Sequence, residues 1–435
     1  MTEPANLSGR AIVYWCSVVL GASGLLPWNL FITAHSYFTF KLRNATHDSW
    51  NWSDSDPHRH DRTYLQKTFE VWLTVSGSSA CVLSNLLTLF IAARVSISSR
   101  MVAGHLLVLV SLIPTIGLVF VPTDQFQLSF FIASLVLCNI AAFGSNGFIG
   151  ATGMGFAAKF PAEIMQAQMF GQSAIAVLVS LLAIASQAAT PAPQWNGLLY
   201  FALAFCFCVF SFICYLAMIR TEFGRWYLAN EEPKVSSVDS EPLLSDHNAV
   251  VNVVTDRPSL SITVVLRKTA YESCLVVLTY GTTLSVFPAL ASLVVTRSVS
   301  LLWKAYFTPV VCFLLYNTGD SVGRMLTRFI RWPNSHSPLL LLWAVARIGL
   351  VPLLLFCNAQ PRHITKAVFV DDWTFVALML TLSISNGYLV SLSSMYGSKQ
   401  VEAHEMEVAG IILGLFCVVG VTVGCFVGSA VVHLL

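Results

Sequence analysis

Charged residues are scarce in this sequence. Only 11% of its 435 residues are Asp, Glu, Lys or Arg, whereas 56% are hydrophobic. A soluble domain usually carries about 25% charged residues, so this chain has less than half the charge needed to cover a surface that faces water. A soluble globular protein is therefore excluded. The net charge of +2 comes from basic residues that lie between apolar runs, so membrane topology explains them and no nucleic-acid partner is expected.

Cysteine is absent from the polar stretch 36–68, and no recognisable catalytic motif occurs anywhere in the chain. The eleven cysteines all fall within or at the ends of hydrophobic runs, at Cys16, Cys81, Cys138, Cys206, Cys208, Cys214, Cys274, Cys312, Cys357, Cys417 and Cys425. This placement favours free thiols that pack as small hydrophobic side chains. The sequence also lacks metal-ligand spacing, a P-loop, a nucleophile elbow and paired catalytic carboxylates. We therefore expect neither an enzyme nor a bound metal or cofactor.

Long apolar runs are what the sequence does contain. Runs of about 18 or more apolar residues indicate membrane-spanning helices, because about 20 residues with a rise of 1.5 Å each cross the hydrocarbon of a lipid bilayer. We predict an all-α integral membrane protein with eleven transmembrane helices, at 11–35, 69–93, 101–121, 127–150, 167–188, 195–219, 270–295, 303–326, 337–357, 373–397 and 407–434. The first run is too long for a cleaved signal peptide and lacks a small-residue cleavage site, so it is interpreted as an uncleaved helix.

The longest polar segment, residues 220–268, divides these spans into six and five. Its composition cannot bury enough apolar surface to order the segment, so we predict a flexible cytoplasmic linker between an N-terminal six-helix bundle, 1–219, and a C-terminal five-helix bundle, 269–435. Within the linker, Asp239, Leu243 and Leu244 fit the acidic dileucine sorting pattern, which binds adaptor proteins. A chance match in a disordered segment is the alternative.

The orientation follows from the basic residues of the loops. One side of the predicted spans carries Arg94, Arg100, Lys159, Arg324, Arg328, Arg331 and Lys399. The loops 122–126 and 189–194 on the other side contain neither Lys nor Arg, and the basic residues at 297, 304, 362 and 366 weaken this asymmetry without reversing it. Because positively charged loops stay in the cytoplasm, we predict a cytoplasmic N-terminus and an extracellular or lumenal C-terminus.

Two N-glycosylation acceptors, Asn44 and Asn51, agree with this orientation, since both lie in the long loop that it places outside. Such tripeptides also occur by chance.

A polar stripe in the eighth predicted span is the main candidate for solute binding. Asn317, Asp320 and Arg324 occupy positions i, i+3 and i+7, so they share one helical face. An ionisable side chain inside a membrane costs about 2.5–3.5 kcal/mol, so the stripe must face protein or a water-filled cavity. A carboxylate can accept hydrogen bonds from a vicinal diol, and a guanidinium can donate to carbonyl or ring-nitrogen acceptors, which suits a neutral, hydroxyl-rich heteroaromatic solute. The alternative is a charge clamp between helices that never contacts substrate.

Other spans supply further candidates. In the first span Leu25, Asn29 and Ile32 form a second stripe beside Trp28, whose ring could stack on a base or only pack. Phe287 and Phe313 are weaker candidates, because phenylalanines in spans usually pack. His35, at the outer end of the first span, is interpreted as facing a loop rather than relaying protons. Arg347 is expected to neutralise backbone carbonyls or an acidic partner such as Glu407.

Several ordered motifs resemble those of the equilibrative nucleoside transporter family. They are Gly24-Leu25-Leu26-Pro27-Trp28-Asn29, the run from Asn317 to Arg324, the run from Arg347 through Pro352 to Asn358, Ser385-Asn386-Gly387-Tyr388, and Glu407-Val408-Ala409-Gly410 at the start of a glycine-rich last helix. The resemblance covers nearly the whole chain. It implies a major-facilitator-like arrangement of six plus five helices around a central cavity, working by alternating access.

The resemblance also implies a set of substrate contacts. Carried over by motif, the contacts are Leu25, Trp28, Asn29, Ile32, Phe287, Phe313, Asn317, Asp320, Arg324 and Val421. One departure concerns the fourth helix, where the family often presents a glutamine to the base and this chain has Gly150, with Asn146 one turn earlier.

The predicted function is facilitated diffusion of nucleosides of the adenosine and uridine class, with nucleobases as further substrates, across the lipid bilayer. A proton-coupled transporter of an acidic organelle is the first alternative, and a membrane receptor is the second. The sequence 357–362 is similar to the intracellular branch of the family, and the dileucine pattern agrees with it, so the lysosome or late endosome stands beside the plasma membrane as a predicted location.

Overall fold

A computed structural model of the chain describes residues 8–43, 63–189, 192–229, 261–362 and 365–435. These residues form helices and no strand, apart from the isolated β-bridges between Val294 and Ala359 and between Cys357 and Phe369. The predicted all-helical class is confirmed. The acceptors Asn44 and Asn51 and the sorting residues Asp239, Leu243 and Leu244 lie outside the described residues.

The first part of the chain, up to residue 229, contributes α1 (Arg10–Thr33), α2 (His35–Lys41), α3 (Tyr64–Ile91), α4 (Ile97–Phe120), α5 (Gln127–Ala142), the π-helix η2 (Phe143–Ala151), α6 (Thr152–Lys159), α7 (Ala162–Ala189), α8 (Pro193–Arg220) and α9 (Glu222–Ala229). The second part contributes α10 (Ile262–Lys268), α11 (Ala270–Leu284), the 3-10 helix η3 (Ala291–Leu293), α12 (Leu301–Phe307), the π-helix η4 (Thr308–Leu314), α13 (Leu315–Phe329), α14 (Pro338–Ala346), η5 (Arg347–Gly349), α15 (Leu350–Leu355), α16 (Asp372–Gly397), η6 (Ala403–Glu405) and α17 (Met406–Val432).

Nine helical segments within the described ranges are long and apolar enough to cross a membrane, and they correspond to the first six and the last three predicted spans. The two other predicted spans differ for physical reasons. α11 has only 15 residues and ends before Pro288, whereas a membrane crossing needs about 20. The eighth predicted span consists of α12, η4 and α13 in sequence, and α13 carries the charged stripe, which lowers its mean hydropathy.

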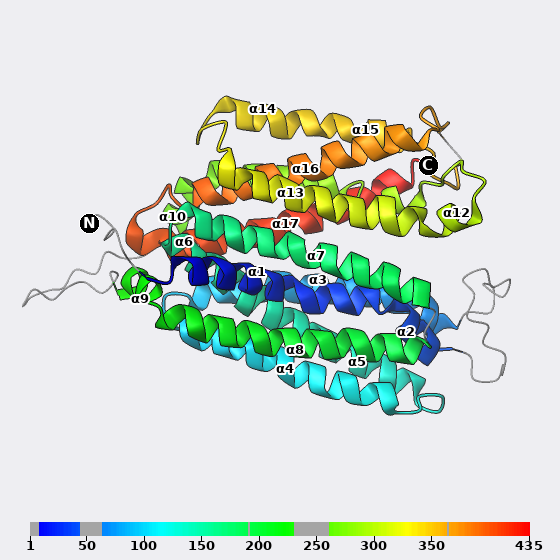
Figure 1. The fold of residues 1–435 in the computed structure, drawn as a ribbon, viewed down its shortest axis with the longest axis horizontal. Coiled ribbons are helices and arrows are strands. Elements are labelled where there is room, and N and C mark those ends of the chain that lie inside the picture. Colours follow the sequence, from blue (N-terminus) through cyan, green and yellow to red (C-terminus); the bar gives the residue numbers. More distant parts are fainter. Residues whose placement is uncertain (1–7, 44–62, 190–191, 230–260, 363–364) are drawn as a thin grey trace, which may run out of the picture.

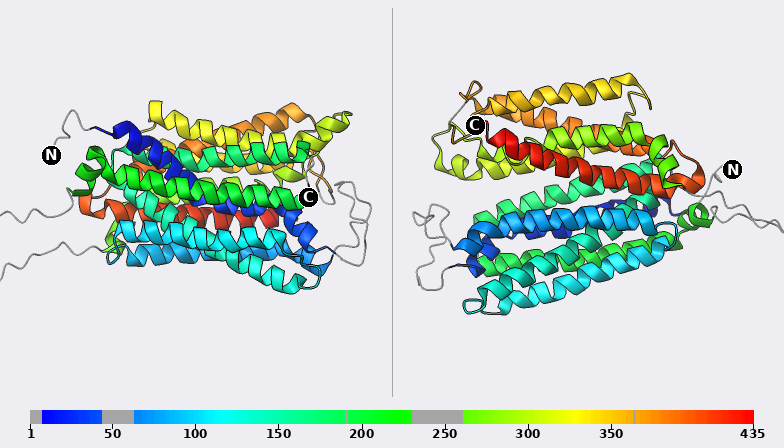
Figure 2. Two further views of the ribbon diagram at one scale, coloured as in Figure 1. Left: turned by 60° about the horizontal axis from the view of Figure 1, so that its bottom comes forward. Right: turned by 180° about the vertical axis from the view of Figure 1, so that it is seen from behind.

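The helices of the first part lie together on one side of the molecule and those of the second part on the other, as Figure 1 shows. Within the first part α1 packs against α7, α8 and η2, and within the second α13 packs against α16 and α11 against α17. Two seams join the parts: α7 packs against α13 and α16, and α17 packs against α6 and α3. The start of α1 and the C-terminus lie at opposite ends of the bundle in both views of Figure 2.

Two of the helix contacts bring backbones together without intervening side chains. A Cβ on Gly171 in α7 would lie 1.9 Å from the carbonyl oxygen of Val18 in α1, and a Cβ on Gly387 in α16 would lie 2.0 Å from that of Asp320 in α13. In an apolar solvent, helix association depends on this close packing of small residues rather than on the hydrophobic effect. The glycines therefore fix the position of α1 and of the helix that carries the polar stripe.

The predicted linker 220–268 is wrong at both of its ends. Glu222–Ala229 and Ile262–Lys268 are helices. The first is amphipathic and is held to the N-terminus, because the hydroxyl of Ser8 donates a 2.7 Å hydrogen bond to the carboxylate of Glu222. The linker prediction missed them because short helices that dock on a bundle do not need a long apolar run. All eleven cysteines are free thiols, as their positions predicted.

Gly171→Ala is expected to lower the stability of the detergent-solubilised protein by roughly 1–3 kcal/mol, because the added methyl group meets a backbone that cannot move freely. The matched control is Gly117→Ala in α4, where nothing lies within 4 Å of an added Cβ and the higher helix propensity of alanine should stabilise. Thermal unfolding of both variants checks this. Equal effects of the two substitutions would show that the α1–α7 contact does not limit stability.

Candidate functional site

Asp320 and Arg324 form an ion pair inside the protein, as their spacing on one helical face allowed. The Nε of Arg324 donates to the Oδ2 of Asp320 at 2.9 Å, and their side chains are only 4% and 7% exposed. A buried ion pair needs further hydrogen bonds to offset the loss of hydration. The surrounding helices provide them.

Three helices supply partners to this pair. The amide of Asn386 in α16 donates to Asp320 Oδ1 at 2.6 Å. The guanidinium of Arg324 donates from Nη1 to the carbonyl of Met169 in α7 at 2.9 Å and from Nη2 to the hydroxyl of Tyr280 in α11 at 3.1 Å. Because α7 belongs to the first part of the chain, Arg324 links the two parts.

Arg347 contacts the charged pair only indirectly. Its guanidinium is bound by neutral oxygen atoms and not by Glu407, the acidic partner that was the alternative to backbone carbonyls. Its guanidinium donates to the hydroxyls of Ser385 at 2.8 Å and Thr283 at 2.6 Å, and also to two backbone carbonyls. The Thr283 hydroxyl in turn lies 2.8 Å from the Oδ1 of Asn386, the residue that holds Asp320. Arg347 is therefore satisfied by neutral oxygens, as the carbonyl alternative predicted, and it connects to Asp320 through Thr283 and Asn386.

The third residue of the stripe, Asn317, lies on the same seam between α7 and α13. Its amide donates to the hydroxyl of Ser180 at 2.8 Å and to the carbonyl of Ala176 at 3.3 Å. Deeper on the seam, the amide of Gln166 donates to the carbonyl oxygen of Arg324 at 3.1 Å. Polar contacts thus follow the α7–α13 seam over several turns.

The residues of the first-span stripe occupy two environments. Leu25 and Trp28 pack against the core of the first part, and a Cβ on Gly77 of α3 would lie 2.1 Å from the ring of Trp28. Asn29 is half-buried one turn before Thr33, whose hydroxyl donates to its carbonyl at 2.7 Å. Ile32, by contrast, is 45% exposed and lines a cavity.

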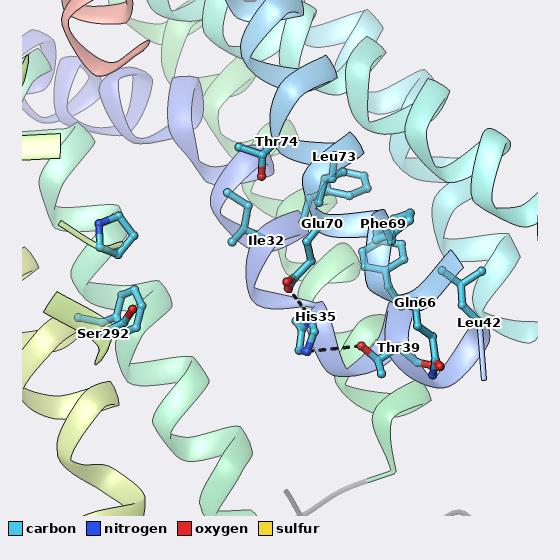
Figure 3. A pocket seen from close by; sticks show the side chains of 14 residues that line it. Ile32, His35, Thr39, Leu42, Gln66, Phe69, Glu70, Leu73, Thr74 and Ser292 are labelled. Carbon is cyan, nitrogen blue, oxygen red and sulfur yellow. Dashed lines mark hydrogen bonds and ion pairs between the residues drawn. The ribbon is translucent and has the colours of Figure 1, made fainter. Parts of the chain in front are cut away.

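This cavity of about 480 Å³ opens between the two parts at the end of the bundle where α1 meets α2. From the first part it is lined by Phe31, Ile32, His35, Phe38, Thr39, Leu42, Gln66, Phe69, Glu70, Leu73 and Thr74. From the second part it is lined by Pro288, Ser292 and Phe313, and Figure 3 shows Ser292 across the space from Ile32 and Glu70. We call this the cavity end.

His35 lies in this cavity rather than facing a loop, which corrects the expectation from sequence. It is the first residue of α2, and its Nδ1 lies 2.5 Å from a carboxylate oxygen of Glu70 in α3 (Figure 3). Its other ring nitrogen lies 3.4 Å from the hydroxyl of Thr39. The short helix α2 after α1 places the histidine at the cavity, and no pattern in the sequence indicated this helix.

The aromatic candidates of the second part lie together beside the cavity. The ring of Phe287 stacks on Tyr316 with a centroid distance of 3.8 Å and meets Phe313 edge-on at 5.9 Å. Phe313 is 37% exposed and lies one turn before Asn317. Val421, on α17, is half-buried one turn after Cys417.

The opposite end of the bundle carries Arg10, and we call it the closed end. Ion pairs between side chains and hydrogen bonds from a lysine join the two parts of the chain there. Glu407 at the start of α17 pairs with Arg100 of α4 and, at 3.0 Å, with Lys159 at the end of α6. The ammonium of Lys399 donates to the carbonyls of Ala158 and Phe160 at 2.8 and 2.6 Å. Burial lowers the pKa of Lys399 to about 8. These contacts connect the loop after α16 and the start of α17 to α6.

Three polar residues of the site were not predicted from the sequence: Tyr280, Gln172 and Asn386. Asn386 stands in a motif that the sequence analysis quoted, and each of the other two is a polar side chain inside an apolar run, which was the available signal. Among the described residues, no group of three His, Cys, Asp or Glu side chains converges on a metal position.

Within the described residues, nine apolar helical segments, a buried ion pair that contacts both helical parts and a cavity lined by both parts are typical of a multi-pass membrane protein of the transporter class. A sequence profile described as "Nucleoside transporter" matches residues 132–433. The chain is 31% identical over 434 residues to Equilibrative nucleoside transporter 1 of Mus musculus, covering 93% of this chain and 94% of the relative. It is 29% identical to Equilibrative nucleoside transporter 2 of Homo sapiens, with 93% of each chain covered.

A third relative, Equilibrative nucleoside transporter 3 of Rattus norvegicus, is 29% identical, with 99% of this chain and 90% of the relative covered. The chain belongs to the equilibrative nucleoside transporter family, which confirms the resemblance seen in its motifs. Members of this family are transporters, not enzymes, and so is this chain.

Asp320→Asn is expected to destabilise the protein by roughly 3–5 kcal/mol, because it leaves the Arg324 guanidinium buried without a counter-charge. The double variant Asp320→Asn/Arg324→Gln removes both charges and should recover most of this loss. Thermal unfolding in detergent measures the two effects. A double variant no more stable than Asp320→Asn would show that the ion pair is not what holds this region.

Proposed function

We propose that the protein is a nucleoside uniporter, which carries nucleosides of the adenosine and uridine class, and nucleobases, by facilitated diffusion through alternating access. Its architecture is eleven membrane-crossing helices, six before and five after the segment 230–260, with α11 and the α12–η4–α13 run as the seventh and eighth. The observation that carries the proposal is the buried Asp320–Arg324 pair, which lies between the two parts of a chain of this family.

The chemistry of this pair favours a neutral solute that donates and accepts hydrogen bonds. Each oxygen of Asp320 has one protein donor and a second lone pair, so the carboxylate can also accept from the vicinal hydroxyls of a ribose. The cavity of about 480 Å³ has aromatic walls at Phe31, Phe38 and Phe313, which suit a base, beside polar side chains such as His35 and Glu70. The proposed contacts are Leu25, Trp28, Asn29, Ile32, Phe287, Phe313, Asn317, Asp320, Arg324 and Val421.

Alternating access is supported by the unequal ends of the bundle. The cavity end is open between the parts, whereas the closed end is joined by Glu407, Arg100, Lys159 and Lys399. The α7–α13 seam lies between them and acts as the pivot about which the parts rock. Opening the closed end requires that these ionic contacts separate and become hydrated.

The membrane orientation places the closed end in the cytoplasm and the cavity end outside or in the lumen. The basic residues of the closed end support this, because Arg94, Arg100, Lys159 and Lys399 all lie at helix junctions there. With this orientation Asn44 and Asn51 face the glycosylating side. Asp239, Leu243 and Leu244 face the cytoplasm, where an adaptor protein could direct the transporter from the plasma membrane to late endosomes or lysosomes.

Proton coupling is the second candidate, and the His35–Glu70 pair is the observation that favours it. Histidine is the side chain that titrates between pH 5 and 8, and this one lies in the cavity 2.5 Å from a carboxylate.

Flux into proteoliposomes tests the proposal. Purified protein should carry radiolabelled adenosine and uridine saturably, with no accumulation above equilibrium at pH 7.4 or 5.5, since a uniporter couples to no ion. Accumulation under an imposed pH difference would instead select the proton-coupled candidate, and ligand binding without flux would indicate a receptor. The stable double variant Asp320→Asn/Arg324→Gln should show no saturable flux, and normal flux would make the stripe purely structural.

Glu407→Gln is expected to loosen the closed end, because Arg100 and Lys159 lose their shared counter-charge. Hydrogen–deuterium exchange of residues 159–163 should become faster, whereas the control Glu402→Gln, at a side chain 72% exposed on the same end, should leave it unchanged.

Raising the pH should instead stabilise the closed end and slow this exchange. Lys399 has a pKa of about 8 in the closed state and about 10.5 when hydrated, so closure releases a proton between these values and is favoured as the pH rises. Unchanged exchange in Glu407→Gln would show that these ions do not hold the closed end.

A further inference from the structure

The hydrogen bonds that Arg324 donates determine which atoms of its neighbours act as acceptors and which remain available as donors. A guanidinium has five N–H donors and no acceptor, so every neighbour that it contacts must accept. The hydroxyl of Tyr280 accepts from Nη2 at 3.1 Å, and the amide oxygen of Gln172 accepts from Nη1 at 3.4 Å. The phenolic proton of Tyr280 and the amide N–H groups of Gln172 are therefore turned away from Arg324 as donors.

These donors have no protein acceptor within the described part of the chain. The Tyr280 hydroxyl and the Gln172 amide nitrogen donate no hydrogen bond there, and one N–H of Arg324 Nη2 is likewise left over. Tyr280 and Gln172 are both only half-buried, whereas the ion pair behind them is almost fully covered. The half-buried groups beside the charged pair thus keep donors that the described residues do not use.

Tyr280 and Gln172 lie between the two parts of the chain. Gln172 lies on α7 and Tyr280 on α11, and Tyr280 packs with Cys417 against the core of the first part. That core also carries Leu25 and Trp28, two of the proposed substrate contacts.

We propose that Tyr280 and Gln172 determine base specificity by presenting a donor pair, polarised by Arg324, to the acceptor edge of an oxo-base. This inference rests on the proposed nucleoside transport. A 6-oxopurine presents two neighbouring acceptors, O6 and N7, whereas adenine presents an amino donor beside N7. The donor pair therefore favours inosine and guanosine over adenosine, and uridine, with its 4-carbonyl, over cytidine, with its 4-amino group.

Inosine and adenosine differ only along one edge of the base, where inosine has a 6-oxo group and N1–H and adenosine has a 6-amino group and an unprotonated N1. We expect the wild-type protein to take up inosine with an apparent affinity about tenfold higher than that for adenosine, because the 6-amino group leaves the donor opposite it unpaired while N7 still accepts from the other donor. Tyr280→Phe and Gln172→Met should each lower the affinity for inosine about fivefold, and the variant that removes the donor opposite position 6 should also lower that for uridine and leave that for adenosine nearly unchanged.

The matched control is Tyr271→Phe, which removes a hydroxyl from the same helix where it donates to the carbonyl of Ser337 at 2.8 Å, away from Arg324. It should leave the inosine-to-adenosine ratio at the wild-type value. Competition of both nucleosides against uridine flux in proteoliposomes gives the ratios, and ligand-induced shifts in unfolding temperature give them independently for a variant with weak flux.

Two outcomes would overturn the inference in different ways. If Tyr280→Phe and Gln172→Met weaken inosine and adenosine equally, base reading is wrong while nucleoside transport stands. If wild-type protein shows saturable flux of none of inosine, adenosine and uridine, the proposed function fails and the inference fails with it.

Discussion

The structure depends on one constraint: two charged groups must be held inside an apolar bundle. Neither Asp320 nor Arg324 could remain buried alone, and the partners come from Asn386, Tyr280 and Met169 on three different helices. α7, α11, α13 and α16 are therefore tied to one point, and α7 is the only one of the four that belongs to the first part of the chain. The pair thus couples its own stability to the contact between the two parts.

The remaining contacts between helices differ in whether water can replace them. Gly171 against Val18, and Gly387 against Asp320, are backbone contacts within each part, where a small displacement would cost close packing. Between the parts, the closed end is held by ion pairs and by a lysine on carbonyls, and also by close packing of α17 on α6, where a Cβ on Gly410 would lie 2.4 Å from the carbonyl oxygen of Met154. Water can replace the ionic contacts but not the packed one.

Much of this could be predicted from the sequence, and the failures have physical causes. Apolar runs located nine spans, because the requirement to satisfy every backbone group in lipid leaves helices as the available structure. Spacing alone placed Asp320 and Arg324 on one face. The spacing of residues along the sequence could not predict contacts between helices. Glu407, one of the partners considered for Arg347, pairs with Arg100, and His35, which was expected to face a loop, lies in the cavity. The short helices α2, α9 and α10 leave no long apolar run, so tertiary docking alone defines them.

The charges at the centre also determine what kind of solute the site suits. Asp320 and Arg324 neutralise each other. Arg347 keeps its positive charge, but its guanidinium is buried and already donates to two hydroxyls and two carbonyls, so it is not free to bind an anion directly. A phosphorylated solute would have to leave water without a counter-charge that is free to meet it, because Arg324 is already committed to Asp320. A neutral solute has only hydrogen bonds to exchange. Since Arg324 makes its neighbours donors and Asp320 remains an acceptor, the best exchange is with a molecule that accepts at one end and donates at the other, as an oxo-base on a ribose does.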